Sequence, residues 1–163
     1  MKKQLTLIRH AKSSWDNTSL SDHARDLNKR GRRDAARMGE ALRERGIGFD
    51  LILCSSAKRA RETLALLREQ LEIEDDAVTF LDDLYCAPAP TLVELIRQVD
   101  NGKNSIAIIA HNPGLEDLAA MLSDEREPFS TCTVMQIEFE MDSWKQVDKV
   151  IGKRTLFLSP KTV

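Results

Sequence analysis

The sequence is poor in the residues that usually build disulfide frameworks, zinc sites and membrane segments. It has only three cysteines, an odd number, and none stands in a Cys-x-x-Cys pair. This usage argues against a disulfide framework and against metal ligation. The apolar stretch near the amino terminus stops at Arg9, too early for a signal peptide or a membrane span. We therefore expect a cytoplasmic protein that uses no metal or other cofactor and does not insert into membranes.

A large excess of charge of one sign is also missing. The chain has 24 Lys and Arg against 26 Asp and Glu, a formal net charge of -2 at pH 7. This balance provides no global attraction for nucleic acid or a membrane surface, so any attraction for anions has to be local. At 163 residues the chain suits one domain. No linker, repeat or low-complexity segment divides it, and we expect a single domain over 1–163.

Short apolar runs alternate with stretches of helical periodicity along the chain. The pattern predicts strands at 5–8, 51–54, 78–81, 105–110, 133–139, 146–151 and 155–158, and helices at 28–45, 57–71, 91–99 and 114–122. Asn28 is expected to cap the first helix, Gly46 to end it, and Thr91 to cap the third. Strands that alternate with helices predict an α/β fold with three layers, α/β/α, and a mostly parallel central sheet.

Polar residues suited to catalysis follow three of the predicted strands. The first strand ends at Arg9-His10, the second leads to Arg59, and the fourth ends at His111. The carboxyl ends of strands border the ligand crevice in such sheets, so these side chains are expected to meet. Each of them alone could be an ordinary solvated or structural residue. Their joint occurrence at strand ends favours a common site.

These residue types suit the transfer of a phosphoryl group. Imidazole is a competent nucleophile near neutral pH, because an unperturbed pKa of about 6.5 leaves much of it unprotonated. Arginine makes bidentate contacts to phosphate oxygens and stays charged. A transferring phosphoryl group spreads negative charge over its equatorial oxygens, so catalysis depends on fixed cations and donors. Backbone amides after Asn112-Pro113-Gly114 could add further donors.

Three blocks of the sequence resemble the histidine phosphatase superfamily. Arg9-His10-Ala11 resembles its Arg-His-Gly signature, and the segment Ser55–Thr63 resembles its second block, in which a strand end leads to Arg-Ala-x-x-Thr. His111, in the sequence Ile-Ile-Ala-His-Asn-Pro, matches the late histidine of the family. The order of the blocks and their strand context agree, and the resemblance covers about residues 5–122.

The resemblance implies a phosphoglycerate mutase-like fold and a covalent mechanism. In this family scheme His10 is the nucleophile that becomes phosphorylated, Arg9 and Arg59 bind the phosphoryl oxygens, and His111 is a further donor. The reaction consists of two in-line displacements. The leaving group departs as His10 takes the phosphoryl group, and water then releases phosphate from the phosphohistidine.

The sequence departs from the larger members of the family at three places. Ala11 replaces the usual glycine, which requires a backbone position without positive φ. Asp16 stands where other members place an asparagine against the phosphate, and a carboxylate there repels substrate unless it is protonated, hydrogen-bonded or turned away. Leu81-Asp82-Asp83 matches only loosely the segment that supplies a proton donor in many members, and the helical lid insertion is missing. Asp16 and Asp83 are the two candidates for a general acid, and both could equally be solvated loop residues.

The missing acid bears on the substrate. A protonated imidazole leaves a phosphohistidine far more readily than an alkoxide leaves a phosphoester. The compact chain looks most like the small bacterial phosphohistidine phosphatases of the SixA type, which dephosphorylate a histidine on a signalling protein. A pocket without a lid can admit a side chain of another protein but holds a small metabolite poorly. We expect a phosphohistidine protein as the substrate and phosphate as the product.

Two other functions stay open at this point. One is a phosphatase or mutase that acts on a small phosphoester, although a mutase has to shield its phosphoenzyme from water and no enclosing insertion is present. The other is a non-catalytic module that keeps the phosphate pocket as a ligand sensor, although the nucleophile and both arginines are retained. The basic run 25–37 is interpreted as the solvated face of a helix, from which Arg25 and Arg30 could attract an acidic partner. Trp15 and Tyr85 either line the pocket rim or pack.

Overall fold

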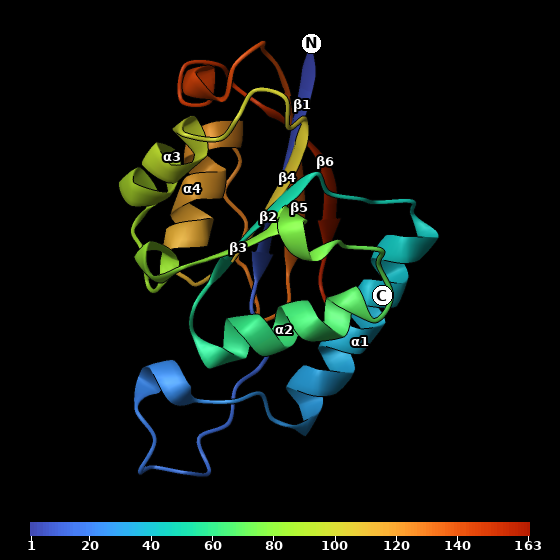
Figure 1. Ribbon diagram of the computed structural model, residues 1–163, viewed down its shortest axis with the longest axis vertical. Coiled ribbons are helices and arrows are strands. Elements are labelled where there is room, and N and C mark those ends of the chain that lie inside the picture. Colours follow the sequence, from blue (N-terminus) through green and yellow to red (C-terminus); the bar gives the residue numbers. More distant parts are fainter.

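A six-stranded sheet forms the centre of the fold, with helices on both faces (Figure 1). The computed structural model describes residues 1–163. The strands lie in the order β3-β2-β4-β1-β5-β6. Their bounds are Lys2–Arg9 for β1, Leu51–Ser55 for β2, Val78–Leu81 for β3, Ser105–Ala110 for β4, Val134–Glu140 for β5 and Lys153–Leu158 for β6. Strands β1 to β4 are parallel to one another and β5 is antiparallel to both of its neighbours, which confirms the mostly parallel sheet.

Two pairs of helices cover the sheet. α1 (Lys29–Glu44) and α2 (Lys58–Arg68) lie on one face, and α3 (Ala89–Arg97) and α4 (Gly114–Ser123) lie on the other (Figure 1). Successive strand residues point to opposite faces, so they enter two separate hydrophobic clusters. Leu5 and Leu7 pack with the α3 and α4 side, whereas Ile8 packs with the α1 and α2 side. The three-layer architecture is therefore confirmed, and it explains why these strands are apolar almost throughout.

The ends of α1 form as the sequence predicts. The Asn28 side chain accepts a hydrogen bond from the backbone N–H of Gly31 at 2.8 Å. Gly46, just beyond the helix, has a φ of +68°, a conformation that glycine adopts without steric cost. The start of α3 differs from the prediction: it begins at Ala89, with Pro88 as N-cap, and not at Thr91. Proline is well tolerated at a helix start because the first N–H groups have no partner within the helix.

The predicted strand at 146–151 is wrong. The chain instead forms a short 3₁₀ helix, Trp144–Gln146, in which the Ser143 and Gln146 side chains complete a capping box. Local side-chain bonds of this kind compete with pairing in a sheet. Trp144 is fully buried and donates its indole N–H to the carbonyl of Lys103 at 2.7 Å. Other 3₁₀ helices are η1 (Asp22–Ala24), η2 (Asp75–Ala77) and η3 (Asp82–Leu84).

The carboxyl ends of three neighbouring strands, β2, β4 and β1, meet at one edge of the sheet, the lower edge in Figure 1. The segment 10–28, between β1 and α1, loops beyond this edge, and α2 begins close to it. No helix has the combination of length and apolar character that crossing a bilayer requires.

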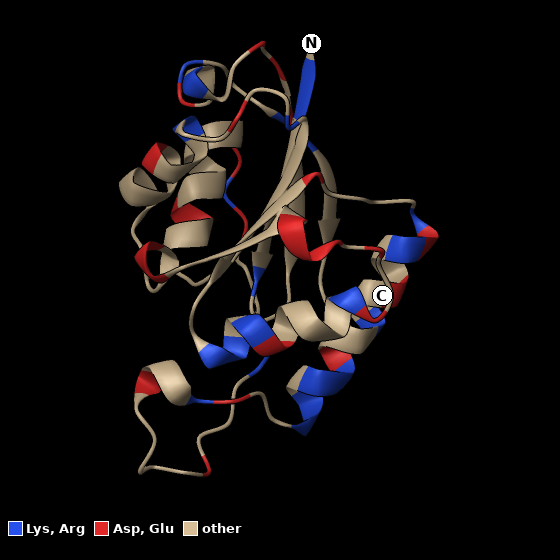
Figure 2. Ribbon diagram, in the orientation of Figure 1, with Lys and Arg blue, Asp and Glu red and all other residues tan.

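The basic run lies mainly on the outer surface of α1. Figure 2 shows Lys and Arg gathered along the first half of this helix. Lys29, Arg32 and Arg33 are exposed there, as the interpretation of a solvated helix face predicts. Arg25 behaves differently because it precedes the helix and is buried.

Candidate active site

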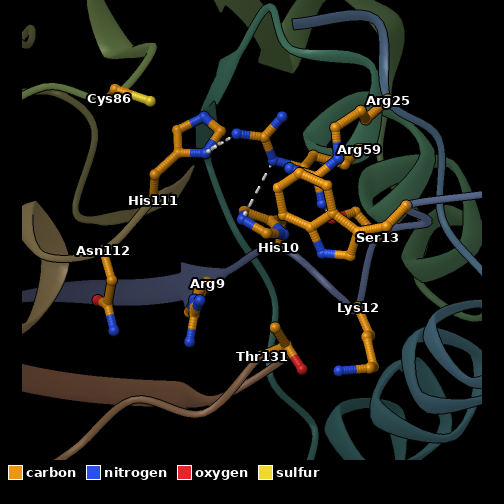
Figure 3. A pocket seen from close by; sticks show the side chains of 11 residues that line it. Arg9, His10, Lys12, Ser13, Arg25, Arg59, Cys86, His111, Asn112 and Thr131 are labelled. Atoms are coloured by element: carbon orange, nitrogen blue, oxygen red, sulfur yellow. Dashed lines mark hydrogen bonds between the residues drawn. The ribbon is translucent and has the colours of Figure 1, made fainter. Parts of the chain in front are cut away.

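A cavity of about 260 Å³ opens at the edge where β1, β2 and β4 end (Figure 3). Most of the residues that line it are polar or basic: Arg9, His10, Lys12, Ser13, Trp15, Arg25, Arg59, Cys86, His111, Asn112 and Thr131. The structure thus brings together Arg9, His10, Arg59 and His111, the four residues that the strand-end pattern and the family resemblance selected. They come from the ends of β1 and β4 and from the first turn of α2.

The spacing of Arg59 and Thr63 joins α2 to the loop that follows His10. The two residues lie one turn apart, and the Thr63 hydroxyl donates to the carbonyl of Arg59 at 2.7 Å. The same hydroxyl accepts the backbone N–H of Ala11 at 3.0 Å. Ala11 is fully buried and is not among the residues with positive φ, so the replacement of glycine costs no backbone strain at this position.

His10 is held in one tautomer. Its Nδ1 lies 2.7 Å from the carbonyl oxygen of Ala11, which can only accept, so Nδ1 carries the proton. Nε2 therefore keeps its lone pair, and it accepts from the Nε of Arg59 at 3.4 Å. Burial, together with the positive charges of Arg59 and Arg9, lowers the pKa of His10 to about 4. The imidazole is neutral at pH 7 and has an unprotonated nitrogen beside an arginine.

His111 is fixed by contacts on both ring nitrogens. Its Nδ1 faces Nη2 of Arg59 at 3.4 Å, and because arginine only donates, this nitrogen accepts. Nε2 then donates to the hydroxyl of Ser55 at 2.8 Å. Burial, followed by the neighbouring His10 and Arg59, lowers the pKa of His111 to about 3. Figure 3 shows Arg59 between the two histidines, whose ring centroids are 5.1 Å apart.

One hydrogen-bond donor of Arg9 has no partner in the protein. Its Nη1 donates to the carbonyl of Phe129 at 2.7 Å, while its Nε is buried and has no partner in the protein. An unsatisfied buried donor costs free energy, so a bound oxyanion would be stabilised by it. Arg9 and Arg59 both line the cavity, and two guanidinium groups at one cavity suit the binding of phosphate.

Asp22 holds Arg59 and Arg25 in place, and sequence reasoning missed it. Its carbonyl accepts from Arg59 at 2.7 Å, and its carboxylate accepts from Arg59 at 3.1 Å and from Arg25 at 2.9 Å. The Tyr85 hydroxyl donates to the same carboxylate. The bond from Tyr85, followed by those from the arginines, lowers the pKa of Asp22 to about 2, and the pKa of Tyr85 rises in turn to about 12. No motif marks Asp22, because it stands in a polar loop without periodicity.

Neither candidate acid reaches the cavity. Asp16 is exposed, its backbone N–H donates to the Ser14 hydroxyl at 3.1 Å, and its carboxylate does not line the cavity. The carboxylate is thus turned away, one of the conditions under which it does not repel an anion. Asp83 is exposed in η3, where Leu84 takes the buried position. The structure therefore places both acids in solvent, away from His10.

The amides that open α4 are already paired. The N–H of Leu115 donates to the carbonyl of His111 at 3.1 Å, and the N–H of Glu116 donates to the Asn112 side chain at 3.3 Å. Asn112 in turn donates to the Glu116 carboxylate at 3.1 Å. These groups stabilise the turn after β4, so the N–H groups of Leu115 and Glu116 are not the further donors that the sequence suggested for an anion.

A family model and several known proteins match the sequence. The family model described as histidine phosphatase superfamily (branch 1) matches residues 5–85. An uncharacterized chloroplastic protein of Arabidopsis thaliana is 34% identical over 158 residues, which cover 92% of this chain and 72% of that protein. A 2,3-bisphosphoglycerate-dependent phosphoglycerate mutase of Bartonella henselae is 36% identical over 77 residues, 46% of this chain and 37% of the mutase.

Solved structures share the whole fold. SixA from Nakamurella multipartitia superposes with a TM-score of 0.86 and 22% identity, covering 98% of this chain and 97% of that one. The protein histidine phosphatase SixA complexed with tungstate has a TM-score of 0.82 and 23% identity, covering 97% of both chains. At these identities the likeness establishes the fold, which carries no lid insertion of the kind found in larger relatives.

Proposed function

The chain is a phosphatase of the histidine phosphatase superfamily, and from this premise we propose that it hydrolyses phosphohistidine on a protein through a transient phosphohistidine at His10. The observation that carries the proposal is the state of His10. Its Nδ1 proton is held by the Ala11 carbonyl, its pKa of about 4 keeps it neutral, and its Nε2 lies beside Arg59 in a cavity rich in positive charge.

The first step is an in-line displacement. Nε2 of His10 gives up the hydrogen bond that it accepts from Arg59 and attacks phosphorus. The bond from phosphorus to the leaving group breaks, and its electron pair stays with the leaving group. The free Nε of Arg9 and the guanidinium of Arg59 stabilise charge on the equatorial oxygens. His111 donates from Nε2 to Ser55 and accepts at Nδ1 from Arg59, so in this arrangement it positions the Arg59 guanidinium beside His10.

The second step restores the enzyme. A water oxygen attacks phosphorus from the side opposite Nε2, and the phosphorus–nitrogen bond breaks. Its electron pair returns to Nε2, and the proton lost by water stays with the phosphate product or passes to solvent. His10 is neutral again, with its Nδ1 proton still held by the Ala11 carbonyl.

The acids around the site support a nitrogen leaving group. Asp22 has a pKa of about 2 and Tyr85 a pKa of about 12, so neither is a suitable proton donor near pH 7. A departing alkoxide needs such a donor, which contributes roughly 10²- to 10⁴-fold to the rate. The imidazole of a phosphohistidine can leave already protonated. This contrast favours phosphohistidine over a phosphoester as the substrate.

A phosphoester substrate is the second candidate, favoured by the sequence match to phosphoglycerate mutases. That match covers 77 residues and 37% of the mutase. Phosphate release from a histidine-phosphorylated protein should be compared with release from phosphoglycerates and sugar phosphates at equal concentration. We expect a preference for phosphohistidine of about a hundredfold or more, the contribution of a missing general acid. Equal or faster turnover of any of the phosphoesters would refute the proposed substrate.

Detection of a phosphorylated His10 distinguishes a catalytic protein from one that only binds phosphate. Rapid quenching with a labelled phosphoryl donor should yield an acid-labile, base-stable adduct on His10, and His10→Asn should yield none. Arg61→Met, on the exposed side of α2, is a control that should label normally. If the unmodified protein binds phosphate but takes up no label from any activated donor, it is a binding module.

A further inference from the structure

The mouth of the active-site cavity carries a large apolar side chain in solvent. Trp15 is 74% exposed, and it lines the active-site cavity. Its indole lies over the guanidinium of Arg25, with 3.3 Å between the Arg25 Cζ and the ring centroid. Tryptophan is among the residues that contribute most to binding interfaces, because it presents much apolar area at low entropic cost.

The loop that presents Trp15 is anchored at its base. Ser13 and Leu27 form an isolated antiparallel bridge, and the Ser14 N–H donates to the carbonyl of Asp26 at 2.7 Å. The Arg25 Nε donates to the carbonyl of Ser14 at 3.0 Å. Trp15 thus stands on fixed backbone next to the site, so little ordering is needed when a partner covers it.

A second cavity shares the Trp15–Arg25 stack with the first. It measures about 200 Å³ and is lined by Trp15, Asn17, Thr18, Leu20, Asp22 and Arg25. Trp15 and Arg25 line both cavities. Leu20 is itself 38% exposed, so the second cavity has two apolar walls in contact with solvent.

The charges in the second cavity are already paired. Nη1 of Arg25 donates to Asp22 at 2.9 Å, its Nη2 donates to the Ser13 hydroxyl, and its face is covered by Trp15. Asp22 also pairs with Arg59 at 3.1 Å. An acidic group would gain little from such a site, whereas an uncharged apolar group would remove Trp15 and Leu20 from water.

We propose that Trp15 and Leu20 form a specificity subsite for an apolar side chain of the protein substrate, one that neighbours the phosphorylated residue. This inference rests on the proposed function. Successive Cα atoms are about 3.8 Å apart, so a residue next to one whose modified side chain enters the first cavity lies within reach of the wall that the two cavities share. The shared wall therefore favours an apolar neighbour of the phosphorylated residue as the occupant.

The test uses two phosphohistidine pentapeptides that differ only beside the modified residue, with leucine on both sides in one and serine in the other. Phosphoramidate, which has no side chain to place in the subsite, is the reference. We expect a KM about tenfold lower for the leucine peptide, the scale of partly burying one or two apolar side chains. Trp15→Ala should reduce this preference to about one, and Leu20→Ala should reduce it about threefold.

Two further variants distinguish a subsite from a structural role. Trp15→Phe keeps an aromatic ring over Arg25 and should retain most of the preference. Ile151→Ala removes an equally exposed side chain, 69% accessible, just before β6 and so at the opposite edge of the sheet, and should retain all of it.

The outcomes separate this inference from the proposed function. Hydrolysis of both peptides without a leucine preference, or a preference that survives Trp15→Ala, overturns the subsite alone. A loss in Trp15→Ala that is equally large with phosphoramidate also overturns it, because the residue would then act only through Arg25. If the unmodified protein hydrolyses neither peptide nor phosphoramidate, the proposed function itself fails and the subsite with it.

Discussion

Replacing Arg59 by methionine tests the proposed mechanism most directly. Methionine fills similar space without charge or donors. Arg59 is 5% exposed and lies 3.4 Å from both His10 Nε2 and His111 Nδ1. Removing a preorganised donor from such a site costs about 10²- to 10³-fold in rate, or about 2.7–4 kcal/mol. We therefore expect kcat/KM for phosphoramidate to fall by that factor.

The same substitution has a second consequence that a structural defect would not produce. The charge of Arg59 lowers the pKa of both histidines, so both pKa values should rise when it is removed. Titration of the imidazole signals by NMR measures this directly. Arg59→Lys keeps the charge but loses the planar fork, so it should retain the low pKa values while losing much of the activity.

A matched control and a clear refutation are available. Arg61 lies two residues further along α2 and is exposed, so Arg61→Met should change neither kcat/KM nor the histidine titrations. Arg59→Met activity within threefold of the unmodified protein, with the fold intact, would refute the role of Arg59. Unchanged histidine pKa values would refute the electrostatic account of the site.

Three further predictions follow from the same contacts. His10 should titrate near pH 4 in the free protein, and an NMR midpoint near 6.5 would contradict this. Because the residue in the unfolded chain takes up its proton near pH 6.5, the free energy of unfolding should decline as pH falls from about 6.5 to 4. Thr63→Val leaves the buried N–H of Ala11 without its acceptor, so the free energy of unfolding measured by urea titration should fall by about 1–3 kcal/mol. An unchanged free energy of unfolding would show that water replaces the hydroxyl. Asp22→Asn weakens the restraint on Arg59 and Arg25, and because the carboxylate is half exposed, kcat/KM should fall only about tenfold. The control Asp16→Asn should have no effect, and equal effects of the two variants would reject Asp22 as the positioning residue.

The strand ends show which residues of the site a local sequence pattern can predict. Arg9-His10, Arg59 and His111 could be found because each follows an apolar run, and parallel strands bring their carboxyl ends to one edge. The capping box at Ser143 and Gln146 is also a local sequence signal, and it indicates a helix start where the apolar pattern alone predicts a strand at 146–151. Signals of this kind are local, so they can be recognised in the sequence without knowledge of the fold.

The choice of carboxylate depended on tertiary structure alone. Sequence position favoured Asp16 and Asp83, yet the chain turns both outward and brings Asp22 to Arg59 and to Tyr85, 37 and 63 residues away. Nothing in a loop without periodicity specifies such contacts, because they form only when β2, α2 and η3 have packed against the loop.

The sequence by itself therefore determined the α/β layers, the parallel strands and the identity of four residues that line one cavity, since spacing and apolar period encode which elements form and where they end. Only the folded chain decided the tautomer of His10, the pairing of Asp22 with two arginines and the exposure of Trp15. Those features result from contacts between distant segments, whose distances and desolvation are set by packing.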